Sequence, residues 1–239
     1  VYGRYFYKSS DECAVPACGG SWYSNGRYEE IQTNKIPPAN KLLTRGWNWI
    51  FNGIAACNEI ITKRNYHLSS LKEREDHSWN EILRAFYYYQ AISCWGNVPF
   101  TTDYTETDTR NKVVNIFSTI WKKEINDNIE FLDREPSDTN YGRATQAAAY
   151  CYSCEKCIWM QKHGSVLQCM TKQRKPVKDI MDIGAYSIED SYSTNFDIKN
   201  EDSKENIFVI LYDRVYTSGD SNSFLFAYAD IGSCITSNI

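Results

Sequence analysis

Histidine is scarce in this chain, with three among 239 residues. His67, His77 and His163 do not lie in a nucleophile elbow, in a recognisable Cys/His pattern or at the spacing of a metal site. A glycosidase needs two carboxylates across a scissile bond, but the many acidic residues here lie in polar stretches where a solvated charge is the ordinary outcome. We therefore expect a protein that is not an enzyme, with no catalytic residue and no cofactor. A glycoside hydrolase stays open as an alternative.

Long apolar runs and an excess of one charge are also lacking. No stretch approaches 18 consecutive apolar residues, and the first residues do not form a charged segment followed by an apolar one. The 26 basic and 30 acidic residues give a net charge of −4 without a long run of either sign, so nucleic acid is not an expected partner. We expect residues 1–239 to form a single domain. Because Val1 opens what looks like the middle of an element, we also expect this domain to be a fragment of a longer protein.

Apolar and aromatic residues, in contrast, are abundant, at 42% and 15% of the chain. Their densest pattern covers residues 81–99 and occupies most of the circumference of a helix, which predicts a helix packed between others. Gly96, followed by Pro99, marks its end, because glycine tolerates the left-handed conformation of a C-cap and proline cannot continue the helix. A polar connection is expected before it, at 64–76.

A second long helix is predicted for residues 39–63. Its inward stripe alternates at spacings of three and four residues: Leu43, Trp47, Ile50, Ile54, Cys57 and Ile61. Asn58 shares a face with these apolar residues and would need a hydrogen-bond partner if buried.

Three further helices are expected at 113–132, 144–162 and 165–182, the last interrupted by Pro176, and a strand is expected at 205–213. The helices follow one another as antiparallel pairs of about 35–45 residues, which is typical of a helical-repeat array such as tetratricopeptide repeats.

Nine cysteines are present, and three of them form a C-x2-C-x2-C run at Cys151, Cys154 and Cys157. A second set of Cys or His ligands at matching spacing is missing, so we expect these residues to pack as small apolar side chains on a helix and to bind no metal.

Residues 9–30 are predicted to be a loop, with turns at Gly19-Gly20 and Asn25-Gly26, and this loop is rich in aromatic side chains. Trp22, Tyr23 and Arg27 suit carbohydrate: a flat aromatic face packs against the C–H face of a sugar ring, and polar side chains hydrogen-bond its hydroxyls. The same residues would also serve a protein interface, or would fold back onto the helices.

Several segments together resemble the SusD/RagB family of Bacteroidetes outer-membrane nutrient-binding lipoproteins. They are SSDECAVPACGGSWYSNGR at 9–27, WNWIFNGIAACNEII at 47–61, LRAFYYYQAISCWGNVPF at 83–100, YGRATQAA at 141–148 and SKENIFVILYD at 203–213. They follow one another in the family's order and cover nearly the whole chain.

This resemblance implies a mainly α fold: an α-superhelix of tetratricopeptide-like helix pairs with long loops and little β structure. It also implies a non-catalytic, surface-exposed glycan-binding protein in the outer membrane, held there by a lipid anchor that this chain does not contain. A SusC-like TonB-dependent transporter would be its partner. The family's ligand contacts correspond to Trp22, Tyr23, Arg27, Trp47 and Asn48. A helical-repeat scaffold that binds only protein stays open as an alternative.

Overall fold

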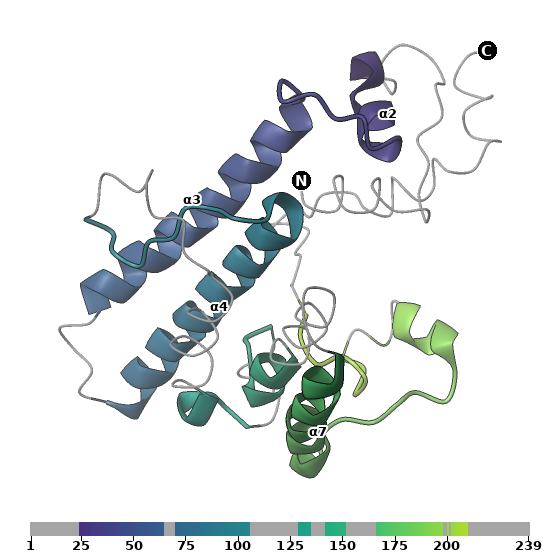
Figure 1. Ribbon diagram of the computed structural model, residues 1–239. Coiled ribbons are helices and arrows are strands. Elements are labelled where there is room, and N and C mark those ends of the chain that lie inside the picture. Colours follow the sequence, from purple (N-terminus) through teal and green to yellow (C-terminus); the bar gives the residue numbers. More distant parts are fainter. Residues whose placement is uncertain are drawn as a thin grey trace. The chain divides into compact units, whose positions relative to one another are not determined.

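The computed structural model describes residues 24–64, 70–105, 129–134, 142–151, 166–197, 200 and 202–209 (Figure 1). The chain divides into two compact units, Val1–Asn52 with Leu211–Ile239 and Gly53–Ile210. Among the described residues none belongs to a strand, and the regular elements are helices. The prediction of a mainly α fold is therefore confirmed.

In the first unit, a short 3-10 turn, η1 (Ser24–Gly26), leads directly into helix α2 (Arg27–Gln32). The predicted turn is present, because Asn25 and Gly26 both have left-handed φ angles of 56° and 78°. The loop predicted to run to residue 30 is wrong from Arg27 onward. Two carboxylates in the first turn of α2, Glu29 and Glu30, favour a helix there through its dipole, and Ile31 is fully buried.

Asn40 joins this turn to the next helix, α3 (Lys41–Arg64). Its side-chain nitrogen donates to the Arg27 carbonyl oxygen at 3.0 Å and to Glu30 Oε2 at 2.8 Å, and its Oδ1 accepts from the Leu42 amide at 2.8 Å. The last bond satisfies one of the free amides at the start of a helix, so Asn40 acts as the cap. The predicted helix at 39–63 is confirmed.

Helix α4 (Leu71–Trp95) begins ten residues before the predicted one. Ser70 Oγ accepts from the Glu73 amide at 3.2 Å, and Glu73 Oε2 accepts from the Ser70 amide at 2.9 Å. This reciprocal pair is a capping box. The sequence Ser-x-x-Glu was its visible signal, and residues 71–76 of the predicted polar connection at 64–76 are therefore helix instead. The predicted end at Gly96, with φ 73°, is confirmed.

The second half of α3 and α4 lie side by side (Figure 1). A Cβ on Gly53 would lie 2.5 Å from Tyr87 Cζ, and further along α3 the Asn58 side chain bonds that of Arg84. The position on α4 falls as the position on α3 rises, so the pair is antiparallel, as predicted.

Their interface is made largely of the expected apolar residues. On α3, Ile54, Cys57 and Ile61 are buried, and on α4 the buried apolar side chains are Ile82, Ala85, Tyr88, Ala91 and Ile92. Tyr88 is the largest fully buried side chain, and the sequence pattern did not single it out. In the first unit, Leu42 is buried, whereas the predicted Leu43 and Trp47 are only half-buried.

The remaining elements are shorter or described in part. Of the helix predicted at 113–132, the described end forms a 3-10 turn, η3 (Ile129–Phe131), which packs on α4; the rest lies outside the described residues. Residues 146–151 are helical, and the remainder of the helix predicted at 144–162 lies outside the described residues. Helix α7 (Val166–Ile183) confirms the prediction at 165–182 but continues through Pro176.

Residues 205–209 are not a strand, although a strand was predicted at 205–213. This segment follows a polar loop that contains the 3-10 turn η4 (Tyr192–Phe196), and its side chains are half-buried rather than alternately buried and exposed. Residues 210–213 lie outside the described residues. None of the helices that the structure describes is long and apolar enough to cross a membrane.

Candidate functional site

The predicted ligand residues fall in the first unit. Trp22 and Tyr23 lie outside the described residues. Arg27 is the first residue of α2 and is half-buried. Trp47 and Asn48 follow one another on α3, about 100° apart around its axis: Trp47 stacks on Phe51 with ring centroids 4.3 Å apart, and Asn48 is exposed. This set stays a prediction.

In the second unit, buried polar groups fix the segment that follows α4. The Tyr88 hydroxyl donates to the Thr101 carbonyl oxygen and accepts from the Thr101 amide, both at 2.9 Å. Asn58 Nδ2 donates to the same carbonyl at 3.1 Å, and Arg84 Nη1 donates to Asn58 Oδ1 at 2.8 Å and to the Thr102 carbonyl oxygen at 3.5 Å. The expectation that Asn58 would need a partner is thus confirmed, because the residue is 2% exposed. We call Asn58, Arg84, Tyr88 and Thr101 the buried clamp.

Tyr104 follows the clamp in a tight turn. Asp103 Oδ1 accepts from both the amide and the hydroxyl of Thr105, at 2.8 and 2.7 Å. Tyr104 itself is 50% exposed, and Lys63 Nζ lies 6.0 Å from the centroid of its ring. Lys63 also pairs with Glu59 one turn earlier on α3, and the hydrogen bond to Glu59 raises the pKa of Lys63. An aromatic side chain is therefore held in the open beside the end of α3.

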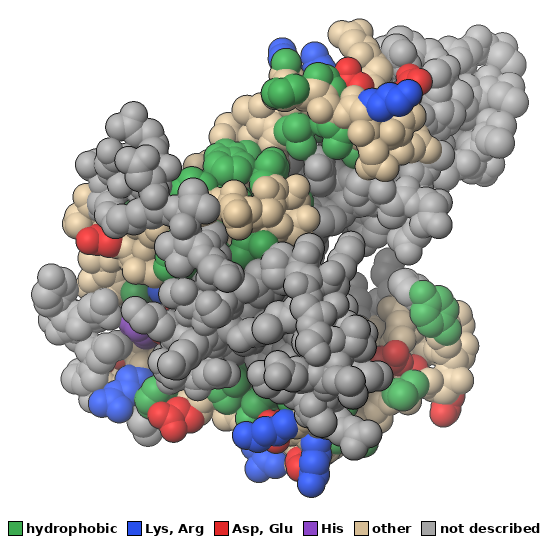
Figure 2. Space-filling model, viewed as in Figure 1, with side chains coloured by type: hydrophobic (Ala, Val, Ile, Leu, Met, Phe, Trp, Pro, Cys, Tyr) green, Lys and Arg blue, Asp and Glu red, His purple; other side chains and the backbone are tan. Residues whose placement is uncertain are grey.

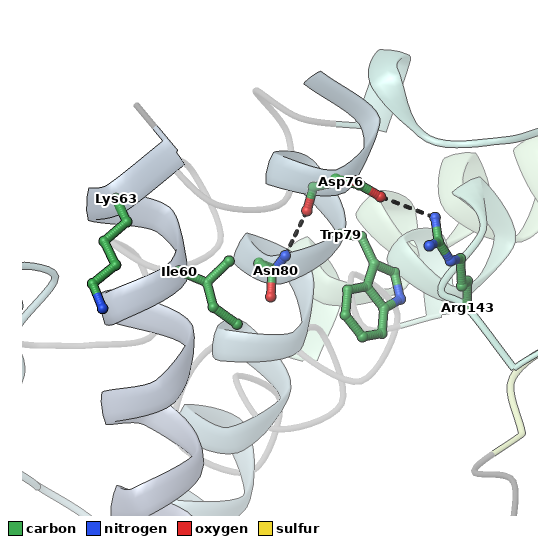
Figure 3. A pocket seen from close by; sticks show the side chains of 6 residues that line it. All are labelled: Ile60, Lys63, Asp76, Trp79, Asn80 and Arg143. Atoms are coloured by element: carbon green, nitrogen blue, oxygen red, sulfur yellow. Dashed lines mark hydrogen bonds and ion pairs between the residues drawn. The ribbon is translucent and has the colours of Figure 1, made fainter. Parts of the chain in front are cut away.

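A hollow of about 350 Å³ lies next to Lys63, between α3 and α4. Figure 3 shows its lining side chains: Ile60 and Lys63 from α3, Asp76, Trp79 and Asn80 from α4, and Arg143 from the segment that precedes the helical residues 146–151.

The charged groups of the hollow are balanced. Arg143 Nη1 donates to Asp76 Oδ1 at 3.0 Å and lies 3.6 Å from Glu75 Oε1, while its Cζ lies 5.9 Å from the centroid of the Trp79 ring. Burial, and then the neighbouring Asp133, raise the pKa of Glu75. Asn80 Nδ2 donates to the Asp76 carbonyl oxygen at 2.6 Å. On the face seen in Figure 2, basic and acidic side chains are likewise interspersed.

An aromatic ring, an exposed isoleucine, an amide and charged groups lie together in this region, and such a mixture can orient a bound ligand. Among the described residues, no group of three His, Cys, Asp or Glu could hold a metal ion. Of the predicted packing cysteines, Cys151 is half-buried, and Cys154 and Cys157 lie outside the described residues. Burial raises the pKa of the Cys94 thiol to about 12, so its thiolate is disfavoured.

The sequence pattern did not indicate Tyr104 or Trp79 as candidate site residues. Trp79 precedes residue 81, where the helix of residues 81–99 was expected to start, and Tyr104 lies in the polar stretch after Pro99. The signal for Tyr104 was the one used for Trp22: an aromatic residue inside a polar loop. No local signal pairs it with Lys63, 41 positions earlier.

Comparison with known proteins identifies the family. A family model of SusD-like proteins, described as starch-binding and associating with the outer membrane, matches residues 5–154. The chain belongs to the SusD-like family. The resemblance found in the sequence motifs is thereby confirmed. Among curated proteins, none matches this chain.

Solved structures of SusD-like proteins share the fold. Surface glycan-binding protein A from Bacteroides uniformis is 17% identical with a TM-score of 0.76, over 87% of this chain and 46% of that protein. The Bacteroides thetaiotaomicron protein of the same name, in complex with laminarihexaose, is 21% identical with a TM-score of 0.73, over 88% and 44% of the two chains. A SusD-like protein from Bacteroides fragilis is 16% identical with a TM-score of 0.73, over 90% and 42%. The chain spans less than half the length of these proteins.

Proposed function

We propose that this chain is part of a non-catalytic glycan-binding protein at the cell surface. The observation that carries the proposal is the family model, because it matches 5–154, well over half of the chain, and its description is starch-binding. The residue chemistry supports it: aromatic side chains occur in polar loops, and the three histidines have no catalytic pattern around them.

Binding would use Trp22, Tyr23, Arg27, Trp47 and Asn48. The aromatic rings would cover the apolar face of a sugar, and the guanidinium and amide would hydrogen-bond its hydroxyls. No bond of the glycan would be made or broken, so the bound sugar would leave unchanged.

The family further supports a place at the outer membrane and a handover step. We propose that the protein is a lipid-anchored surface protein, and that it delivers bound glycan to a SusC-like TonB-dependent transporter. A co-purification of the two membrane proteins from cells grown on the glycan would test the partnership. Recovery of the transporter without this protein would contradict it.

The binding itself is tested by calorimetry of the purified chain against laminarihexaose, soluble starch and a panel of other polysaccharides. We expect one of them to bind, and we expect replacement of Trp22 and Tyr23 with Ala to abolish binding at this site. The matched control is Tyr192→Ala, which removes an aromatic side chain that is 80% exposed and lies outside the proposed site. Absence of binding to every glycan would contradict the proposal, and shortened products in the mixture would favour a glycoside hydrolase.

A helical-repeat scaffold that binds only protein is the alternative. One observation favours it: large apolar side chains are exposed at the end of α7 and just after it, with Met181 at 73% and Ile188 at 86%. The scaffold hypothesis predicts no affinity for any sugar, so the same calorimetric panel separates the two.

A further inference from the structure

We infer that Tyr104, Lys63, Ile60 and the hollow beside Trp79 form a second saccharide-binding surface in this protein, distinct in sequence from the predicted site at Trp22, Tyr23 and Arg27. This inference rests on the proposed glycan-binding function and assigns a further contact region for the same kind of ligand.

The aromatic element of this surface is held in place before any ligand arrives. Thr101 is fixed by three hydrogen bonds: its carbonyl oxygen accepts from Tyr88 and Asn58, and its amide donates to the Tyr88 hydroxyl. Two residues further on, the Asp103 carboxylate closes a turn around Tyr104. A loop that is already ordered loses little conformational entropy on binding, which favours affinity. The buried clamp and the Asp103 turn therefore fix the backbone that carries Tyr104.

The ring of Tyr104 has the exposure that stacking on a sugar requires. Lys63 Nζ lies over the ring at 6.0 Å, and half of the residue surface remains open to solvent. Ile60, one turn before Lys63 on the same helix, is 39% exposed and also lines the hollow. Lys63 lines the hollow as well, so one residue contacts both the Tyr104 ring and the hollow. Figure 3 shows the residues that line the hollow.

The polar groups of the hollow can recognise hydroxyls. The Asn80 side chain uses its nitrogen to bond the Asp76 carbonyl oxygen, and its Oδ1 accepts no hydrogen bond from the residues that the structure describes. Arg143 uses Nη1 for its carboxylate partners, which leaves further guanidinium N–H groups as donors. The Asn80 acceptor and the Arg143 donors both line the hollow, and together they suit the hydroxyl groups of a sugar, which are donors and acceptors.

Charge and size narrow the ligand class. Lys63 is paired with Glu59, and Arg143 lies near both Glu75 and Asp76, so no unbalanced positive charge is available for an acidic sugar. The volume of about 350 Å³ lies at the lower end of the range for small-molecule sites, about 300–1,000 Å³. A neutral glycan that places one end in the hollow and a neighbouring ring on Tyr104 fits both limits.

The test uses the glycan that the unmodified chain binds best in the calorimetric panel, beginning with laminarihexaose. Tyr104→Ala should weaken binding about three- to tenfold, because one aromatic contact is lost. Tyr104→Phe should bind like the unmodified chain, because the ring remains. Tyr192→Ala is the matched control for loss of an exposed tyrosine, and the thermal transitions of all three variants should be unchanged.

The outcomes separate this inference from the proposed function. If the unmodified chain binds the glycan and Tyr104→Ala binds it equally well, the inference of a second surface is wrong, while the proposed glycan-binding function stands. If Tyr104→Phe is as weak as Tyr104→Ala, the ring is not the contact, and the inference is again wrong. If the unmodified chain binds no glycan at all, the proposed function fails and this surface fails with it.

Discussion

The α3–α4 hairpin and the segment 184–209 are held together in different ways. In the hairpin, apolar side chains on two long helices bury one another, and its helices were visible as periodic patterns in the sequence. In the segment, hydrogen bonds between polar side chains and backbone replace the apolar core: Ser203 Oγ donates to Glu189 Oε1 at 2.6 Å, and the Glu189 amide donates to Glu205 Oε2 at 2.9 Å. Two of its large apolar residues, Ile188 and Tyr192, are exposed, whereas Phe208 contacts Phe86 of α4 with ring centroids 6.3 Å apart.

The two regions differ in how far their structure depends on residues that are distant in the sequence. A helix forms its backbone hydrogen bonds locally, so its apolar spacing already indicates it. A loop closed by polar side chains depends on partners 14 or 16 positions apart, and no periodic pattern reports them. The hairpin also contains one set of contacts between residues distant in the sequence, the buried clamp.

The largest effect is expected from Arg84→Met. Arg84 is 3% exposed and donates to Asn58 Oδ1, so its loss leaves a buried acceptor without a donor and should lower the free energy of unfolding by about 2–3 kcal/mol. Denaturant unfolding measures this loss of unfolding free energy. The matched control is Arg45→Met on the exposed face of α3, with a change of at most about 0.5 kcal/mol. Equal effects of the two substitutions would mean that the clamp does not stabilise the hairpin.

Gly53→Ala tests the apolar part of the hairpin. A Cβ there would lie 2.5 Å from Tyr87 Cζ, and overpacking of this kind costs about 1–3 kcal/mol, partly offset by about 1 kcal/mol from the better helix propensity of alanine. We expect a net loss of about 1 kcal/mol in unfolding free energy.

A double-mutant cycle provides the control. In a Tyr87→Ala background the clash is gone, and Gly53→Ala should become neutral or stabilising. If Gly53→Ala lowers the unfolding free energy equally in both backgrounds, the close packing of α3 on Tyr87 is not the cause of that loss.

Ser203→Ala tests the polar segment. The substitution removes the hydrogen bond to Glu189 and should lower the free energy of local opening of this segment by about 1 kcal/mol. Hydrogen exchange should speed up at the Ser187, Glu189 and Glu205 amides, while the α4 amides keep their protection. Faster exchange along α4 would show that the two regions unfold as one unit.

The smallest effect is the response of the same segment to acid. Hydrogen bonds from the Asn195 side chain and then from the Glu189 amide lower the pKa of Glu205, so the folded segment favours the carboxylate. The resulting stabilisation is complete above the pKa of an unfolded glutamate, about 4.3, and is lost as the pH falls through the lower folded value. Exchange of the Glu189 amide should therefore accelerate, relative to the intrinsic rate, only below about pH 4.3. Loss of its protection at pH 6 would contradict the assignment.

The sequence by itself determined the helical elements. Apolar spacing was enough to predict helices at 39–63 and 165–182 and the end of α4 at Gly96, because helix formation and helix termination depend on neighbours within a few residues. It placed the start of α4 ten residues too late and predicted a loop where α2 begins, because the capping box at Ser70 and the acidic first turn of α2 are weaker local signals than apolar periodicity. It also predicted a strand at 205–213, where the described residues 205–209 form none.

Tertiary structure alone decided which side chains meet. Asn58 pairs with Arg84 across 26 positions, Tyr104 lies beside Lys63 across 41, and Arg143 reaches Asp76 across 67. Each of these contacts combines residues that have no common pattern in the sequence, because the antiparallel packing of α3 on α4 and the return of the chain along α3 bring them together. The suitability of single aromatic and polar residues for binding sugars could be recognised from the sequence. The proximity of Tyr104 to the hollow beside Trp79 depends on the packing of α3 on α4.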